Sequence, residues 1–505
     1  MTTLSITGED LDFRDLAKSA ARQVTPKISD EALARIKASR DLVDAILAEN
    51  RPAYGITTGV GSQKDYKVDP AGAARYNAKL VKAHATRVPG PKLTNEEIRG
   101  ALTFLANQCA RGFSGVSREL AELVTSAVTH DHLPEVDAQG SVGSSDLVPN
   151  SQIASWLMGL PEALKHNLPR PKETLSLINN NAISLSVGSI ALTSAEKLLD
   201  AFDLAGAATL EGFRGCLPSI SQAANRAHTR RGQARTANRL RALLEESLLW
   251  QPGQSNFLQD PLSIRFISQT HGAVWESFER ASEVWNSELN STHDNPILDV
   301  PNGIAVSVGN MDAARMTLAL DYLRLSLARM CDMAGDRIHK IQWPAFSGLP
   351  AGFAEDSAVG GVQFLNMGHI SAALITQVKM EAAPVSLHSV GQVADGVEDT
   401  ASHATHAAFR LKAQLDAAWT VATLELMTAI WALVRRGIKP ADMGAGVRAA
   451  YEIFAPKLPI GREGEEIFDL GPFVEMLRHG DLIATAFAAA SCATGAVRGE
   501  FTPIP

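Results

Sequence analysis

Cysteine is scarce in this sequence, and long apolar runs are absent from it. Only four cysteines occur, Cys109, Cys216, Cys331 and Cys492, and they are widely separated without the paired spacing of a metal site. We therefore predict free thiols in a reducing cytoplasm. The least polar run, residues 483–497, is too short to cross a bilayer, which takes about 20 apolar residues.

Basic charge and a secretory signal are also lacking. Lysine and arginine total 47 against 55 aspartates and glutamates, which gives a net charge of −8 and argues against nucleic acid as a partner. The first residues, Met-Thr-Thr-Leu-Ser-Ile, have neither the charged nor the apolar region of a signal peptide. These observations predict a cytoplasmic protein without a membrane partner.

Helical signals dominate what is present. Ser29 and Thr94 each precede acidic residues in the manner of a helix N-cap. Apolar residues recur at three- and four-residue steps, the spacing of a helix face packed against other helices. The clearest such stripes are Met316, Leu320, Leu323, Leu327 and Met330, and later Leu411, Leu415, Ala418 and Ala422. Because strand-like alternation is rare, we predict an all-α protein.

No composition shift or low-complexity linker divides the 505 residues. We therefore predict one continuous unit, 1–505, with a loop-bearing portion over about 1–200 and helices over about 201–505. Apolar residues make up 45% of the chain, which is enough to bury a substantial core.

A loop rich in small residues interrupts this helical pattern. Residues 140–149 read Gly-Ser-Val-Gly-Ser-Ser-Asp-Leu-Val-Pro, a composition that disfavours both helix and strand interiors. It resembles the prosthetic-group loop of the histidine and phenylalanine ammonia-lyase family, Gly-Ser-Val-Gly-Ala-Ser-Gly-Asp-Leu, and is one residue shorter. Irregular backbone within a helical protein often serves a site.

Other stretches resemble the same family in the same order, from about residue 30 to the end. The most specific is 288–296, Glu-Leu-Asn-Ser-Thr-His-Asp-Asn-Pro, where the family has Glu-Ile-Asn-Ser-Ala-Thr-Asp-Asn-Pro. Further matches lie at 54–61, 106–115, 177–180, 259–265, 347–350 and 396–399. The resemblance implies an elongated long-helix bundle that assembles as a homotetramer, with active sites that combine loops from more than one subunit.

The resemblance also assigns roles to individual residues. Tyr54 corresponds to the tyrosine that removes the β-proton of the substrate, although a phenol near its reference pKa of about 10 needs help to act as a base. His84 falls beside the substrate side-chain pocket. Asn179 corresponds to the asparagine that contacts the prosthetic group and the substrate amine. Glu398 corresponds to a glutamate that faces the imidazole ring in histidine-specific members.

A second group of matched positions lies in 259–265 and 309–312. Arg265 is the candidate anchor for the substrate carboxylate, because a guanidinium binds a carboxylate with two parallel hydrogen bonds, and Gln259 lies close to it in sequence. Leu262 stands where the family has a tyrosine, and Met311 where it has a phenylalanine. Both of those aromatic residues support the electrophile in the family.

That electrophile is 4-methylideneimidazol-5-one, which the family makes by cyclising Ala-Ser-Gly with loss of two waters. Aligning on Asp146 places Gly143, Ser144 and Ser145 in the triplet. Ser144 retains the hydroxyl side chain, but Ser145 adds a Cβ where a bare glycine lets the backbone fold onto itself. No metal or nucleotide is expected.

The reaction that follows from the resemblance is elimination of an amine from histidine, or from a histidine-derived amino acid, to give a urocanate-like acid in histidine catabolism. Without the electrophile the alternative is release of trimethylamine from a histidine betaine, the ergothioneine or hercynine type of reaction, because a trimethylammonium group leaves readily. An aminomutase and a non-catalytic helical scaffold stay open. The Gly-Ser-Ser of the loop also resembles the fumarase and aspartase superfamily, but the lysine of that signature is missing.

Overall fold

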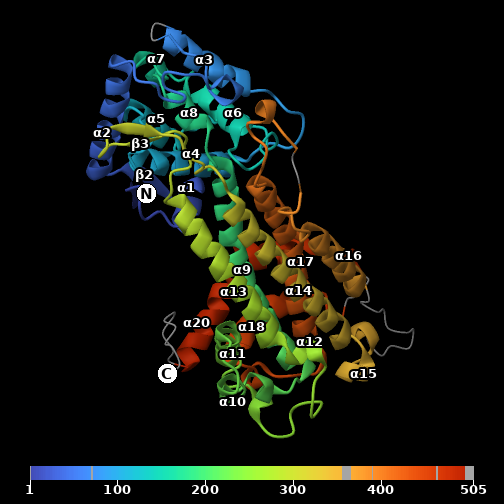
Figure 1. Cartoon of the computed structure of the whole chain (residues 1–505). Coiled ribbons are helices and arrows are strands. Elements are labelled where there is room, and N and C mark those ends of the chain that lie inside the picture. Colours follow the sequence, from blue (N-terminus) through green and yellow to red (C-terminus); the bar gives the residue numbers. More distant parts are fainter. Residues whose placement is uncertain (1, 70–71, 355–365, 389–390, 462–464, 495–505) are drawn as a thin grey trace. The chain divides into compact units, whose positions relative to one another are not determined.

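The computed structural model describes residues 2–69, 72–354, 366–388, 391–461 and 465–494 (Figure 1). Two compact units account for the chain. The first comprises Met1–Thr193, Arg280–Asp321 and Pro384–Lys412, and the second comprises Ser194–Glu279, Tyr322–Ala383 and Ala413–Pro505. Within the described residues helices predominate, which confirms the predicted all-α class.

The first unit holds the loops that matched the family motifs. Its elements are β1 (Thr2–Ile6), α1 (Phe13–Ala20), β2 (Val24–Ile28), α2 (Asp30–Ala48), η1 (Gly61–Gln63), α3 (Ala73–His84), α4 (Asn95–Ala110), α5 (Arg118–Ala127), α6 (Leu147–Leu157), α7 (Pro161–Lys165), α8 (Glu173–Ile178), β3 (Ile297–Asp299), β4 (Ile304–Val306) and η6 (Ala394–Gly396). The strands form two pairs, β1 parallel to β2 and β3 antiparallel to β4.

The second unit is built from helices and 3-10 turns in its described part. Its elements are η3 (Leu217–Ile220), α10 (Gln222–Arg226), α11 (Arg231–Leu243), η4 (Leu248–Trp250), α12 (Leu262–Arg265), α15 (Pro344–Ser347), η5 (Ala351–Phe353), α16 (Asn366–Glu381), η7 (Pro440–Asp442), α18 (Ala445–Phe454), η8 (Ala455–Lys457), α19 (Gly471–His479) and α20 (Leu482–Thr494). Four long helices contribute residues to both units: α9 (Ala182–Phe213), α13 (Ile267–Leu289), α14 (Ala314–Ile341) and α17 (Ala404–Arg435).

The predicted helix starts and apolar stripes are confirmed. The Ser29 hydroxyl accepts from the Ala32 amide at 3.2 Å, and Thr94 forms a reciprocal capping box with Glu97. The two predicted stripes, on α14 and α17, are almost fully buried. They therefore serve as core faces, as their spacing predicts.

Two segments, Glu173–Phe213 and Ala404–Arg435, are long and apolar enough to cross a membrane by composition alone. In each of them 89% of the apolar window is buried inside the protein. Core helices of a globular protein have this property.

The thiols are placed as free cysteines where the structure describes them. Cys109 and Cys331 are buried and Cys216 is half-buried, whereas the side chain of Cys492 lies outside the described ones. Burial raises the pKa of Cys109 to about 12 and also raises that of Cys331. Buried thiols of this kind are unreactive.

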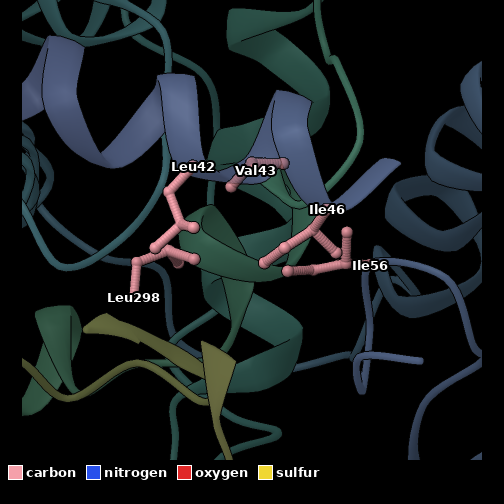
Figure 2. Packing of buried hydrophobic residues seen from close by; sticks show 5 residues of the cluster. All are labelled: Leu42, Val43, Ile46, Ile56 and Leu298. Carbon is pink, nitrogen blue, oxygen red and sulfur yellow. The ribbon is translucent and has the colours of Figure 1, made fainter. Parts of the chain in front are cut away.

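One apolar cluster holds the loop that carries Tyr54. Leu42, Val43 and Ile46 of α2 pack against Ile56 of that loop and against Leu298 of β3 (Figure 2). All five are at most 9% exposed. Burying side chains of this size contributes about 1.5–3 kcal/mol each, so the loop is anchored to a helix and a strand.

Candidate functional site

Tyr54 lies on a tightly turned loop of the first unit. Its hydroxyl oxygen accepts a hydrogen bond from the Gly61 amide at 2.9 Å, which fixes the position of that oxygen. Gly55 has a φ of +64°, and a Cβ there would lie 2.5 Å from Cδ2 of Leu175. The glycine therefore lets the loop lie directly against α8.

The segment that carries Glu398 meets the same loop. Val393 and Glu398 pair through their backbones at 2.9 and 3.2 Å, closing the turn that contains η6. A Cβ on Gly61 would lie 3.9 Å from the Ala394 Cβ, so this turn borders the Tyr54 loop. The Glu398 side chain is exposed.

The loop at 140–146 packs against the start of α17. A hydrogen bond from the His403 amide to the Val142 carbonyl spans 2.9 Å, and the Ser402 amide donates to the Ser144 hydroxyl at 3.0 Å. Gly143 has a φ of +85°, and a Cβ there would lie only 2.3 Å from the Ala404 nitrogen. Only glycine fits this contact between two backbones.

We predict that Gly143→Ala lowers the free energy of unfolding by about 3 kcal/mol, because backbone strain of about 1–2 kcal/mol adds to overpacking. Gly253→Ala is the matched control: φ is +81° there, and nothing lies within 4 Å of the added Cβ. It should cost only the backbone strain, about 1 kcal/mol. Chemical denaturation measures both variants, and equal losses would show that the loop does not pack as described.

Ser145 adopts a backbone conformation suited to glycine. Its φ is +92°, and the residue is 6% exposed. Its hydroxyl lies 3.5 Å from the Ile178 carbonyl at the end of α8. A side chain in this region costs about 1–2 kcal/mol, so the surrounding structure holds Ser145 in place.

Asp146 anchors the 140–146 loop through four hydrogen bonds. Its carboxylate is fully buried and accepts from the hydroxyls of Ser141, Ser184 and Thr405 at 2.6, 2.9 and 2.7 Å, and from the Ser184 amide at 2.8 Å. Burial raises the pKa of Asp146 above its ordinary value, and these hydrogen bonds offset part of that rise. The carboxylate therefore ties the loop to α9 and α17.

Asn179 follows α8 directly and is half-buried beside the loop. Its amide lies 3.5 Å from the Asn295 carbonyl. The side chain of Asn295 in turn accepts from the Val308 amide at 2.9 Å. Because Ser145 approaches Ile178 and Gly55 approaches Leu175, the Tyr54 loop, Asn179 and the 143–145 triplet all border α8.

Two residues that support the 140–146 loop, Asn181 and His293, were not predicted from the sequence. The Asn181 side-chain amide donates to the Gly143 carbonyl at 2.6 Å, and its oxygen lies 3.1 Å from Nδ1 of His293. Both residues are fully buried. The available signals were the third asparagine of the run 179–181 and the histidine within 288–296, where the family motif has threonine.

His293 makes the fold sensitive to acid. Burial, opposed by the hydrogen bond at the Glu288 carbonyl and assisted by the charge of Arg111, lowers the pKa of its imidazole from 6.5 to about 4. The unfolded chain therefore binds a proton between pH 6.5 and about 4 that the folded chain excludes, so stability falls as the pH drops through this window. The two values correspond to roughly 3 kcal/mol.

We predict that His293→Gln flattens this part of the stability–pH curve, because glutamine does not titrate. Denaturant unfolding at several pH values between 7 and 4 measures the slope for both proteins. An unchanged slope in the variant would assign the acid sensitivity to other groups.

His84 and Met311 complete the predicted residues of the first unit. His84 ends α3, and its Nδ1 donates to the Leu80 carbonyl at 2.9 Å, which leaves Nε2 without the proton in the neutral ring. Met311 is half-buried in the turn before α14, where the Asp312 amide donates to the Gly309 carbonyl at 3.0 Å.

Gln259, Leu262 and Arg265 belong to the second unit. With its amide oxygen turned toward Arg265, Gln259 accepts from both terminal guanidinium nitrogens, at 2.5 and 3.1 Å. Leu262 is 51% exposed. Gln259 therefore orients the guanidinium that the sequence marks as a carboxylate anchor.

The short helix that carries Arg265 is fixed by a buried ion pair. Arg337 of α14 donates to both carboxylate oxygens of Glu425, at 2.5 and 2.9 Å, and to the Ser263 carbonyl of α12 at 3.2 Å. Arg337 and Glu425 are at most 1% exposed. A bidentate pair of this kind is rigid, so α12 has a fixed support.

The triplet does not fit the family's electrophile. Cyclisation requires the nitrogen of residue 145 to reach the carbonyl carbon of residue 143. Here Ser145 brings a buried side chain into that turn, and its conformation is already strained. The contact of Gly143 with Ala404 also leaves no room for the alanine that the family has at this position.

Comparison with known proteins agrees with the motifs and the helical fold. The family model "Aromatic amino acid lyase" matches residues 11–455. The histidine ammonia-lyase of Stigmatella aurantiaca is 33% identical over 95% of this chain and 97% of its own.

Two solved structures share the fold over nearly their whole length. One is the ergothioneine-degrading ergothionase of Treponema denticola, solved with desmethyl-ergothioneine sulfonic acid, with a TM-score of 0.86, 26% identity and coverage of 96% of this chain and 99% of that one. The other is the histidine ammonia-lyase of Trypanosoma cruzi, with a TM-score of 0.84, 25% identity and coverage of 99% of both.

The chain therefore belongs to the aromatic amino acid lyase family. It is a carbon–nitrogen lyase of the ammonia-lyase type that acts on a small-molecule amino acid substrate.

Proposed function

We propose that this lyase eliminates trimethylamine from a histidine-derived betaine and gives a urocanate-like unsaturated acid, without the methylidene-imidazolone electrophile. The proposal depends on the conformation of Ser145. Its φ is +92°, and its buried side chain occupies the turn that cyclisation would need. A primary ammonium is a poor leaving group, so its elimination depends on the electrophile. A trimethylammonium group leaves without such help.

The residues around α8 suit this elimination. Tyr54 acts as its phenolate: the oxygen, held by the Gly61 amide, takes the β-proton, and the electrons of that C–H bond form the new double bond. The C–N bond breaks at the same time, and its electron pair leaves with trimethylamine. Asn179 lies beside the breaking bond. Glu398 and His84 recognise the imidazole or thioimidazole ring through hydrogen bonds.

The substrate carboxylate is held by Arg265, which Gln259 orients. The guanidinium also stabilises the charge that develops toward the carboxylate as the proton is lost. The proposed substrate class also has support among the relatives, because one similar structure is an ergothioneine-degrading enzyme.

The proposed assembly is a cytoplasmic homotetramer whose active sites combine loops from more than one subunit. One face of α14 supports it, because Leu318, Tyr322 and Leu325 are 59%, 50% and 48% exposed at helical spacing. Apolar side chains grouped in this way mark an interaction surface. Light scattering coupled to size exclusion should give the mass of four chains, and a monomeric mass with full activity would refute the shared site.

The test of the reaction is a comparison of leaving groups. Purified protein is incubated with histidine, with N,N,N-trimethylhistidine and with ergothioneine, and ammonia and trimethylamine are quantified separately together with the unsaturated acid. We expect trimethylamine from at least one betaine and no ammonia from histidine. Ammonia from histidine alone would refute the proposal, and a β-amino acid product would indicate an aminomutase. Inactivity on all three would favour a scaffold.

A further inference from the structure

A series of buried polar contacts connects Glu288, through His293 and Asn181, to the backbone of the 140–146 loop. His293 is fully buried and lies between Glu288 and Asn181, with Nε2 3.0 Å from the Glu288 carbonyl and Nδ1 3.1 Å from the Asn181 side-chain oxygen. The His293 backbone amide donates to Gln108 at 3.0 Å, and Phe104 packs edge-on against the ring. The imidazole therefore packs against Phe104 and has an oxygen atom close to each of its nitrogens.

Asn181 connects His293 to the 140–146 loop. Its amide nitrogen donates to the Gly143 carbonyl at 2.6 Å, so its oxygen is left to accept from Nδ1 of His293. The Gly143 backbone lies against the start of α17, where an added Cβ would be 2.3 Å from the Ala404 nitrogen, and Ser144 and Ser145 follow it. The orientation of one amide thus decides where this carbonyl points.

We propose that His293 and Asn181 are positioning residues for the lyase reaction: they hold the Gly143 carbonyl and so place Ser144 and Ser145 beside Asn179. Neither residue touches the reacting atoms. The inference rests on the proposed function only for the turnover assay, because the position of the loop is measured independently.

Both ring nitrogens of His293 face oxygen acceptors, Nδ1 the Asn181 side-chain oxygen and Nε2 the Glu288 carbonyl, and the neutral ring has a single N–H to donate to one of them. The charged groups that face the ring are the Glu288 carboxylate at 3.5 Å and Arg111, and Arg315 lies 3.6 Å from the same carboxylate. Burial lowers the pKa of the ring, and the 3.1 Å contact between Nδ1 and Asn181 is the one that connects the ring to the loop.

The family motif explains why this contact belongs to this chain. The family has threonine where His293 stands, and a threonine side chain is too short to join Asn181 to Glu288. This chain therefore differs from the family motifs both at His293 and at Ser145, and both residues affect the 140–146 loop. A loop that does not cyclise needs another means of fixing its backbone, and hydrogen bonds from rigid helices supply it.

The test compares His293→Leu and Asn181→Ser with His293→Gln, which keeps a donor for Asn181. Thr103→Val is the matched control, because it removes the buried hydrogen bonds of 2.9 Å that the Thr103 hydroxyl makes to Ser19 and to the Arg99 carbonyl, and neither partner belongs to the loop. Steady-state kinetics use trimethylhistidine or ergothioneine, whichever the wild type accepts. Hydrogen exchange of the peptide that covers residues 140–150 reports on the loop without turnover.

We expect kcat to fall about 10- to 100-fold in His293→Leu and Asn181→Ser with KM changed less than about 3-fold, since small misplacement of a site is costly. The double variant should fall little further, because both residues act on one carbonyl. Loop exchange should accelerate in both variants, while His293→Gln recovers most of the loss and Thr103→Val changes neither quantity.

Unchanged loop exchange in both single variants, or a fall in kcat that Thr103→Val matches, would overturn the proposal. Additive losses in the double variant would also contradict a shared action on Gly143. If the wild type turns over none of the substrates, the proposed function fails, whereas faster loop exchange in the variants would still support the positioning role.

Discussion

Tyr54→Phe is expected to lower kcat by about 10²- to 10⁴-fold, the usual contribution of a positioned proton-transfer group. Phenylalanine keeps the ring but removes the oxygen that accepts from the Gly61 amide. The packing of Ile56 that anchors the loop is not altered, so the free energy of unfolding should change by no more than about 1 kcal/mol, the usual net contribution of one hydrogen bond. Initial rates on the accepted substrate measure the effect.

Tyr66→Phe is the control for this variant. Tyr66 lies in the same stretch of chain, and its side chain is 68% exposed. The control should retain wild-type kcat and KM. Wild-type turnover by Tyr54→Phe on every accepted substrate would remove Tyr54 from the mechanism and would leave the proton acceptor to be found elsewhere.

Arg265→Gln is expected to lower kcat/KM by about 100-fold or more, mostly through KM. Two charge-assisted hydrogen bonds to a carboxylate are lost, and each contributes about 1.5–3 kcal/mol. Arg265→Lys should recover only part of the loss, because an ammonium cannot form the parallel pair. Substrate-concentration curves for the three proteins measure the effect.

Arg329→Gln is the matched control, because Arg329 pairs with Asp332 on the surface and its side chain is 66% exposed. Surface pairs of this kind contribute little, so its kinetics should equal those of the wild type. If Arg265→Gln kept the wild-type KM, the carboxylate would have to be bound by another cation.

Much of the fold could be predicted from periodicity and capping chemistry, because these are local properties of the chain. The Thr94 capping box and the buried stripe from Met316 to Met330 follow from residues three and four positions apart. The family was also predictable, because its motifs occur in order. The parallel pairing of Thr2–Ile6 with Val24–Ile28 was not predicted, because neither strand shows strong alternation.

The candidate site could be predicted only in part. Tyr54, Asn179 and the triplet 143–145 were selected by their motifs, and the structure brings them together around α8. The contacts beneath the loop join residues far apart in sequence: Asn181 and His293 are separated by 112 positions, and Asp146 and Thr405 by 259. No local pattern encodes such pairs.

Ser145 illustrates what the structure adds. The sequence shows a serine in place of a glycine, and from this one expects crowding. The structure shows that the serine keeps the left-handed backbone of a glycine while its side chain is buried against the end of α8. The substitution therefore places a buried side chain in the turn, and the family's electrophile does not fit there.

The intact mass of the purified active protein decides whether this lyase works without the cyclised electrophile. The denatured wild-type chain is weighed from a preparation that releases trimethylamine from a betaine. We expect the mass of the unmodified sequence. A mass lower by two waters, with the loss located by peptide mapping to residues 143–145, would contradict it and would return the chain to ammonia elimination.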